Sequence, residues 1–349
     1  MIEYPLRVRN GRDLKHHRGF IEELREFGSP TQFLSLEEYR LLSPGERTAY
    51  DESRRRVITR GVMIRNDSYL NVRSVLFGVM REHQHGSGGG HGVLVSADSF
   101  MGKTTVARIL MLDLLTQRLR ADPDCVRDGE IPVAYVNLPS TGTPVGLYRM
   151  LAQYYGLPIG KHETEAVLEG LVQNAVNKCR TELLVIDDVH NLKYGGPYSP
   201  KASAAIRRLG DDINCPILLL GISLEKTGLL IGHEGDQIYA RYRSAEMVSY
   251  EKAHMRAWRK VVVGLVNAMP LLGDNRQTLP TLARDLHTLA EGRLGNLNSI
   301  LSRASLDLIE AGAPEREIIS SRLAAAKAEE VAKEKTFKAV VRRKRGNAA

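Results

Sequence analysis

The segment that most constrains the fold is eight residues long and matches the phosphate-binding pattern Gly-x-x-x-x-Gly-Lys-Ser/Thr at all positions but the first. It runs Ala97-Asp98-Ser99-Phe100-Met101-Gly102-Lys103-Thr104, with alanine in place of the first glycine. An apolar run at 91–97 precedes it, and residues 103–120 follow with helical periodicity. Strand, loop and helix in this order are typical of a P-loop, so we predict that this segment binds the phosphates of a nucleotide.

The residue types in the loop suit Mg-ATP. Backbone N–H groups of the loop and of the helix N-terminus are expected to surround the phosphates. Lys103 is expected to reach the outer phosphates and assist catalysis, and the Thr104 hydroxyl to hold Mg²⁺. Gly102 lacks a side chain where the backbone approaches the phosphates. The predicted ATP-binding residues of this segment are Ala97, Asp98, Ser99, Phe100, Met101, Gly102, Lys103, Thr104 and Thr105.

Two adjacent aspartates follow a second apolar run. Leu183-Leu184-Val185-Ile186 leads directly into Asp187 and Asp188. An acidic pair at a strand end is often a simple helix cap, but a P-loop upstream favours a nucleotide site. Asp187 is then expected to hold Mg²⁺ through water, and Asp188 to act as the base that orients the attacking water. Ser223, just past another apolar run, is expected to contact the γ-phosphate, with an ordinary loop serine as the alternative.

Strand-like and helical segments alternate through the middle of the chain. Apolar runs predict five strands, at 91–97, 132–138, 182–186, 216–221 and, more weakly, 245–249. The alternation predicts an α/β fold in which a parallel five-stranded sheet has helices on both faces. One strand–helix unit, residues 132–180, separates the P-loop from the acidic pair, which predicts an extra strand between the two strands that carry the site.

The sequence on both sides of this domain has helical patterns. Before it, amphipathic stretches at 36–42, 46–59 and 69–81 predict a helical extension that ends at the glycine-rich run 86–90, a hinge or a tight turn. After it, helical patterns continue to a basic tail that includes Arg342-Arg343-Lys344-Arg345. The predicted domains are an N-terminal helical extension (1–85), a nucleotide-binding α/β domain (86–249), a C-terminal helical lid (250–312) and a C-terminal helix with the basic tail (313–349).

The charge balance allows a polyanionic partner. The formal net charge is +8 and the isoelectric point is near 9.3, and Arg54, Arg55 and Arg56 are candidate contacts to DNA phosphates, with a solvated helix face as the alternative. Three cysteines without zinc-like spacing support neither a disulfide framework nor a zinc module. Without a signal-like or membrane-spanning segment, the chain is expected to be cytoplasmic and to have no membrane partner.

Taken together, these residues resemble the AAA+ superfamily, and within it the TniB-like transposition ATPases related to TnsC and, more distantly, to IstB and the replication initiators. The stretches that carry the resemblance are 97–104, 183–192, 206–223 and 292–297. It implies an AAA+ (ASCE-type) P-loop NTPase that forms ATP-dependent homo-oligomers on duplex DNA and recruits or activates a partner transposase at target sites.

The resemblance also assigns roles to single residues. Ser223 matches the first sensor position, and Arg293 the second sensor of the lid, where a helix cap is the alternative. Arg241 or Arg243 matches the region of the arginine finger, which enters the ATP site of the neighbouring subunit, with a plain surface arginine as the alternative. Asp188 stands where TniB-like proteins more usually have glutamate, so we expect slow or partner-stimulated hydrolysis.

Other functions fit the same residues. A signalling or defence ATPase would use the nucleotide to switch a protein–protein interaction. A helicase loader or replication initiator would suit the Asp-Asp pair, although no helix-turn-helix is recognisable after the lid. A protein that binds ATP with almost no turnover is the fourth possibility. The response of ATP hydrolysis to DNA separates these functions.

Overall fold

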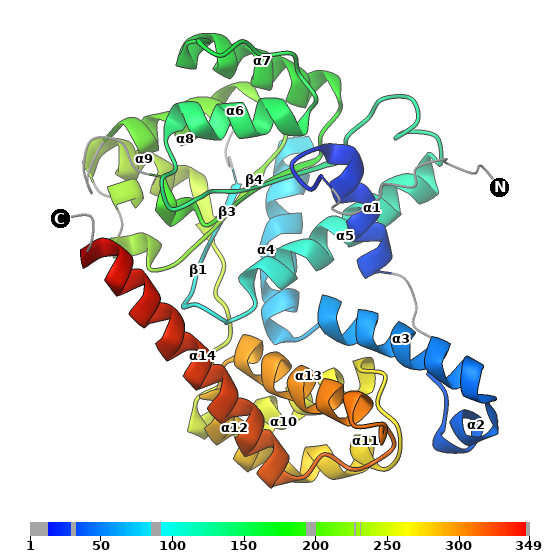
Figure 1. The fold of residues 1–349 in the computed structure, drawn as a ribbon. Helices are drawn as coiled ribbons and strands as arrows, with labels where there is room; N and C mark the ends of the chain where they lie inside the picture. Colours follow the sequence, from blue (N-terminus) through cyan, green and yellow to red (C-terminus); the bar gives the residue numbers. More distant parts are fainter. Residues whose placement is uncertain are drawn as a thin grey trace. The chain divides into compact units, whose positions relative to one another are not determined.

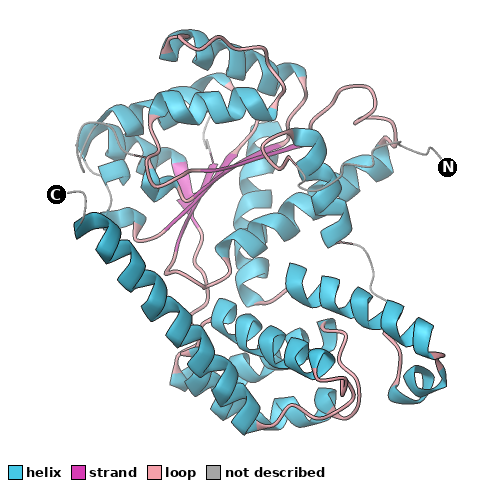
Figure 2. Ribbon diagram, in the orientation of Figure 1, coloured by secondary structure: helices cyan, strands magenta, loops and turns pink. Residues whose placement is uncertain are grey.

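A computed structural model gives the structure of the chain and describes residues 13–28, 33–84, 92–192, 200–226, 228–230 and 232–346. The chain forms two compact units, each assembled from an early and a later part of the sequence. The first is Met1–Ser29 with Asp67–Val248, and the second is Pro30–Asn66 with Ser249–Ala349. Helices dominate both units, and the strands of the described residues lie in the first (Figure 2). The segment predicted as one N-terminal extension is therefore divided between the two units.

The first unit is built on a parallel five-stranded sheet in the order β2-β3-β4-β1-β5. Its strands are β1 (Gly92–Ser96), β2 (Val133–Asn137), β3 (Leu183–Asp187), β4 (Ile217–Gly221) and β5 (Tyr242–Ser244). The prediction that a strand separates the two site-bearing strands is confirmed, because β4 lies between β1 and β3. That strand does not come from the unit at 132–180, whose β2 pairs with the outer side of β3.

Helices cover both faces of this sheet, as predicted. The helices of the first unit are α1 (His17–Phe27), α4 (Asp67–Gln84), α5 (Lys103–Ala121), α6 (Pro144–Tyr154), α7 (Glu165–Lys178), α8 (Pro200–Asp212) and α9 (Gly232–Arg241). Figure 1 shows α4 and α5 on one side of the sheet and α6, α8 and α9 on the other. Right-handed crossovers explain this division. Helix α5 connects β1 to β2 in one direction across the sheet, and the later helices connect β2 through β3 and β4 to β5 in the opposite direction.

Two features of the first unit differ from the sequence prediction. The fifth strand is Tyr242–Ser244 and not 245–249, because this short edge strand buries Tyr242 and pairs with the first residues of β1. Helix α1 was not predicted, although its buried residues Phe20, Ile21, Leu24 and Phe27 have helical spacing. The glycine-rich run 86–90 lies outside the described residues.

The second unit is entirely helical in its described residues. Its α-helices are α2 (Leu36–Leu41), α3 (Pro44–Arg60), α10 (Met255–Ala268), α11 (Asn275–Thr278), α12 (Ala283–Ala290), α13 (Leu294–Glu310) and α14 (Ser320–Gly346). Ser35 and Ser43 each form a capping box that starts α2 and α3. Helix α3 packs on α13, and α14 packs on α12 and α13. Residues 342–345, predicted as a basic tail that follows the C-terminal helix, continue α14, which ends at Gly346.

Arg54 belongs to the interior of this unit. Its side chain is 2% exposed, its Nε donates to the Pro270 carbonyl at 2.8 Å, and its Nη1 donates to Asp51 at 2.9 Å. The neighbouring Arg55 is partly exposed and pairs with Glu52 at 3.2 Å, and Arg56 is exposed. The prediction that all three arginines contact DNA is therefore corrected, because the guanidinium of Arg54 is already bonded inside the protein and has no access to a phosphate.

Replacing Arg54 with alanine is expected to destabilise the protein by about 2–3 kcal/mol, because the buried Pro270 carbonyl and the Asp51 carboxylate each lose a donor. Arg55→Ala is the matched control and should cost less than about 0.5 kcal/mol, since its ion pair is exposed. Urea unfolding of the two variants measures both changes. Equal stabilities would contradict a structural role for Arg54.

Candidate nucleotide-binding site

The P-loop connects the end of β1 to the start of α5. Ala97 N donates to the Gly221 carbonyl at 3.1 Å, which extends the β1–β4 pairing into the loop. Gly102 is the N-cap of α5 in the left-handed conformation, with φ 91°, and no side chain caps the helix. The N–H groups of the first turn are therefore left without a side-chain acceptor, which suits an anion such as phosphate.

Lys103 closes over its own loop. Its Nζ donates to the carbonyls of Ala97 at 2.7 Å and Asp98 at 2.8 Å, and the residue is 8% exposed. Burial lowers the pKa of this ammonium, and the nearby carboxylates of Asp187, Asp188 and Asp98 oppose that shift. Two neutral carbonyls thus hold the charge within the loop, where a phosphate oxygen would be a stronger acceptor.

Asp187 is fully buried at the end of β3 and accepts hydrogen bonds on both oxygens. Thr104 Oγ1 donates to its Oδ2 at 2.5 Å, Tyr135 Oη donates to the same oxygen at 3.0 Å, and Asp188 N donates to Oδ1 at 2.8 Å. Burial raises the pKa of the Asp187 carboxyl, and these hydrogen bonds oppose the rise. Burial also raises the pKa of the Tyr135 phenol, which therefore remains a donor.

The Thr104 hydroxyl and the Asp187 carboxylate fit a magnesium ion. Both are hard oxygen donors and lie within hydrogen-bond distance of each other, and Mg²⁺ in such sites takes its remaining ligands from phosphates and water. Over the described residues, no group of three or more His, Cys, Asp or Glu side chains is placed to hold a metal ion. The arrangement therefore suits a cation that takes few of its ligands from the protein.

The turns after β3 and β4 meet beside this carboxylate. Asp188 and Ser223 both have left-handed backbones, with φ 53° and 47°, and Phe100 in the P-loop has φ 65°. Ile222 N donates to His190 Nδ1 at 3.4 Å, which lies 4.0 Å from Asp188 Oδ1, and Leu224 N donates to Ser96 Oγ at 3.0 Å. Unfavourable backbone conformations that cluster in this way are typical of functional sites.

Comparisons with known proteins agree with this geometry. Residues 86–229 match a family model described as an AAA domain, and the structure of the Aeropyrum pernix ORC1 protein in complex with DNA is similar to the chain, with a TM-score of 0.54. The chain has the AAA+ P-loop fold. The sequence identity to ORC1 is 17%, and the match covers 76% of this chain and 66% of ORC1, about two thirds of its length.

Two more structures share the AAA+ fold. Drosophila ORC bound to DNA has a TM-score of 0.52 and 13% identity, over 90% of this chain and 73% of that one. Cdc6p from Pyrobaculum aerophilum has a TM-score of 0.50 and 17% identity, and the match covers 72% of this chain and 63% of that one. A search of curated protein sequences finds no match. At these identities the similarity concerns the fold.

The arginine-finger candidates lie far from the P-loop of their own chain. Arg241 ends α9 and bonds to Asp211 at 2.5 Å, and Arg243 in β5 bonds to Glu82 at 2.6 Å. Strand β5 pairs with residues 92–94 of β1, so both arginines lie toward the start of β1, whereas the P-loop follows its end. A finger acts on a neighbouring subunit, and this role remains a prediction for both residues.

The other sensor candidates also remain predictions. Ser223 lies in the turn after β4, next to the residues that contact His190 and Ser96. Arg293 belongs to the second unit, where it is the N-cap of α13.

In the described residues, no helix has both the length and the apolar composition needed to cross a membrane.

Tyr135 and His190 are site residues that the sequence analysis did not identify. Strand pairing places Asn137 opposite Asp187, so Tyr135 is a diagonal neighbour of the aspartate on the adjacent strand. Its hydroxyl within the apolar stretch of residues 133–136 was the available signal. His190, two residues after Asp188, gave no signal because its contact is with a turn on another strand.

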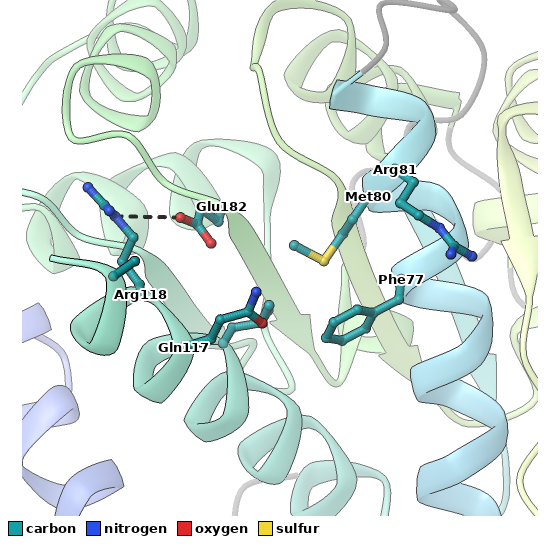
Figure 3. Close-up of a pocket in the computed structure, with 8 residues that line it drawn as sticks. Phe77, Met80, Arg81, Gln117, Arg118 and Glu182 are labelled. Atoms are coloured by element: carbon teal, nitrogen blue, oxygen red, sulfur yellow. Dashed lines mark ion pairs between the residues drawn. The ribbon is translucent and has the colours of Figure 1, made fainter.

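A separate cleft of about 420 Å³ lies between α4 and α5. Figure 3 shows Phe77, Met80 and Gln117 around it, with Arg118 and Glu182 paired at 3.7 Å. Burial raises the pKa of the Glu182 carboxyl, and Arg118 opposes the rise. Glu182 precedes β3 while Asp187 ends it, so this cleft lies at the opposite end of the strand from the nucleotide site.

Proposed function

We propose that this chain is a Mg-ATP-dependent AAA+ ATPase that forms homo-oligomers on duplex DNA and recruits or activates a transposase there. The observation that carries the ATPase is the meeting of Lys103, Thr104 and Asp187 at one end of the sheet, with Asp188 beside them. This set contains a phosphate-binding cation, a magnesium-binding pair and a carboxylate that is free to orient water.

Each residue has a defined part in hydrolysis. Lys103 exchanges the carbonyls of Ala97 and Asp98 for oxygens of the outer phosphates. Thr104 and Asp187 would hold Mg²⁺, which would offset the negative charge of the phosphates. Asp188 is partly exposed, so it is able to orient a water molecule and accept its proton. Ser223 and an arginine of a neighbouring subunit complete the contacts to the γ-phosphate.

Three observations support DNA as the polyanion. The net charge of +8 favours association with phosphates, Arg55 and Arg56 on α3 are accessible, and two similar structures, ORC1 and Drosophila ORC, contain DNA. The resemblance of the motifs to TniB-like ATPases supports a transposase as the protein partner.

An initiator-like ATPase is the second candidate. The similarity of the fold to ORC and Cdc6p favours it. Both candidates predict DNA binding, and they differ in the protein that is recruited. Co-purification with a transposase supports the first function, and co-purification with a replicative helicase supports the second.

ATP hydrolysis is expected to rise severalfold when duplex DNA is added, together with an increase in light scattering from assembly, because an AAA+ site is completed by a neighbouring subunit. Lys103→Ala gives the background rate. The double variant Arg55→Glu/Arg56→Glu should reduce the response to DNA and weaken its dependence on salt, because it removes two phosphate contacts.

The matched control is Arg120→Glu/Arg127→Glu, which makes the same change of charge on exposed residues of the first unit. An equal loss of DNA stimulation in both double variants would mean that the net charge of the protein, and not the position of Arg55 and Arg56, determines the response to DNA. A hydrolysis rate that is indifferent to DNA and responds to a protein partner would replace the DNA function with that of a protein switch.

A further inference from the structure

The buried carboxylate of Asp187 accepts from two hydroxyl groups on the same oxygen, Oδ2. Thr104 comes from the P-loop helix α5, and Tyr135 comes from the adjacent strand β2. When Mg²⁺ is bound, the Thr104 hydroxyl would be shared between the ion and Asp187. The hydroxyl of Tyr135 has no such second task and is able to hold the aspartate in both states.

Helix α1 covers the ring of Tyr135. Phe20 stacks on it with centroids 5.0 Å apart and the planes at 7°, and Phe20 itself is 2% exposed. Phe20 also meets the ring of Tyr154 edge-on at 5.9 Å. A tyrosine packed between its own sheet and a buried phenyl ring is restricted to one side-chain conformation, and this fixes the position of its hydroxyl.

Contacts to two other elements hold α1 in place. His17 Nδ1 donates to the Tyr154 carbonyl in α6 at 3.0 Å, and Glu23 pairs with Arg108 of the P-loop helix at 3.2 Å. Burial lowers the pKa of His17 to about 4, with smaller contributions from His16 and Arg18, so the ring is neutral near pH 7. Helix α1 therefore bridges β2, α6 and α5, all within the first unit.

We propose that Tyr135 is a positioning residue for the metal-binding carboxylate of Asp187, and that α1 sets Tyr135 through Phe20. The N-terminal helix then controls the affinity of the site for Mg²⁺. Displacement of α1 by a partner would free the Tyr135 ring and weaken magnesium binding without touching the P-loop. This inference rests on the proposed nucleotide site and adds a route by which that site is regulated.

Helix α6 offers a control, a tyrosine whose hydroxyl makes a purely structural hydrogen bond to the same strand β2. Tyr154 is fully buried, and its hydroxyl donates to the Val133 carbonyl of β2 at 2.9 Å, with no contact to Asp187. Tyr154→Phe and Tyr135→Phe each remove one hydrogen-bonded hydroxyl beside β2. A difference between them in Mg²⁺ dependence reports on the contact with Asp187 and not on general loss of packing.

The test is a titration of Mg²⁺ at fixed concentrations of a fluorescent ATP analogue, with binding as the readout. Tyr135→Phe is expected to raise the Mg²⁺ concentration for half-maximal binding about tenfold, the usual effect of losing a hydrogen bond to a metal ligand. Phe20→Leu should shift it in the same direction by a smaller factor. Tyr154→Phe should leave it unchanged even where it lowers the melting temperature.

Failure of this inference is distinguishable from failure of the nucleotide site. If the parent protein binds the analogue with Mg²⁺ and Lys103→Ala does not, the site stands, and an unchanged Mg²⁺ requirement in Tyr135→Phe overturns the positioning role. If Tyr135→Phe shifts the requirement and a folded Phe20→Leu does not, the role of α1 is overturned. Absence of binding in the parent protein refutes the proposed site itself.

Discussion

Lys103→Ala is expected to remove nucleotide binding while the apoprotein remains as stable as the parent. The ammonium is buried and bonds only carbonyl oxygens of its own loop among the described contacts. Burial lowers its pKa, which means that its charge is held at a cost in the absence of an anion. Alanine relieves that cost, and the two carbonyls beside the open loop regain water.

The loss of affinity should be large because, at the proposed site, Lys103 would make charge-assisted hydrogen bonds to the phosphates. Each is worth about 1.5–3 kcal/mol, so ATP affinity should fall by about 100-fold or more. Titration with a fluorescent ATP analogue measures this change, and the ligand-induced rise in melting temperature should disappear with it. The melting temperature without nucleotide should stay within a few degrees of that of the parent.

Lys178→Ala is the matched control, since this lysine is exposed at the end of α7, outside the P-loop and its helix. It should leave both quantities unchanged. Lys103→Arg keeps the charge but presents it in a wider, planar group, and it should bind ATP poorly. Affinity in Lys103→Ala equal to that of the parent would mean that the loop is not the nucleotide site.

The features that the sequence predicted well are those fixed by local pattern. The runs that became β1 to β4 are apolar at every core position, and the P-loop is recognisable because it is contiguous between a strand and a helix. The acidic pair could be assigned to the same nucleotide site because the carboxyl ends of parallel strands meet at one edge of a sheet. A strand between the two site-bearing strands was also predicted, but β4 supplies it and not the unit at 132–180.

The features that it missed depend on contacts between distant segments. Arg54 looks like its neighbours in the sequence, and only the carbonyl of Pro270 distinguishes it. Strand β5 contains a single buried residue, Tyr242, so no apolar run marked it. The bond from Tyr135 to Asp187 needs the strand register, and the stacking of Phe20 needs the position of α1. None of these is encoded in a short window of the sequence.

The backbone at Asp188 explains why this position holds aspartate and not the longer glutamate. With φ 53° the residue is left-handed, a conformation in which aspartate and asparagine are enriched several-fold. Its carboxylate lies 4.0 Å from His190, which contacts the turn before Ser223. Aspartate is therefore compatible with this backbone conformation, and its partly exposed carboxylate is accessible to water.

Asp188→Asn is therefore expected to separate binding from hydrolysis. Asparagine suits the left-handed turn and has the same size, so affinity for Mg-ATP should change less than about twofold, whereas loss of the base should reduce turnover by about 10²–10⁴-fold. Single-turnover hydrolysis and an analogue titration measure the two effects on one sample. Asp188→Glu retains a carboxylate in a conformation that suits glutamate less well, and should keep more activity than the asparagine variant.

The alternative that this chain binds ATP with almost no turnover makes the opposite prediction. If the parent protein hydrolyses ATP with DNA present and Asp188→Asn does so equally fast, Asp188 is not the base and water is activated by another group. If both are as slow as Lys103→Ala under every condition, the nucleotide acts as a bound switch, and assembly should then follow ATP binding alone. Only a fast parent and a slow, ATP-bound Asp188→Asn variant support catalysis by this carboxylate.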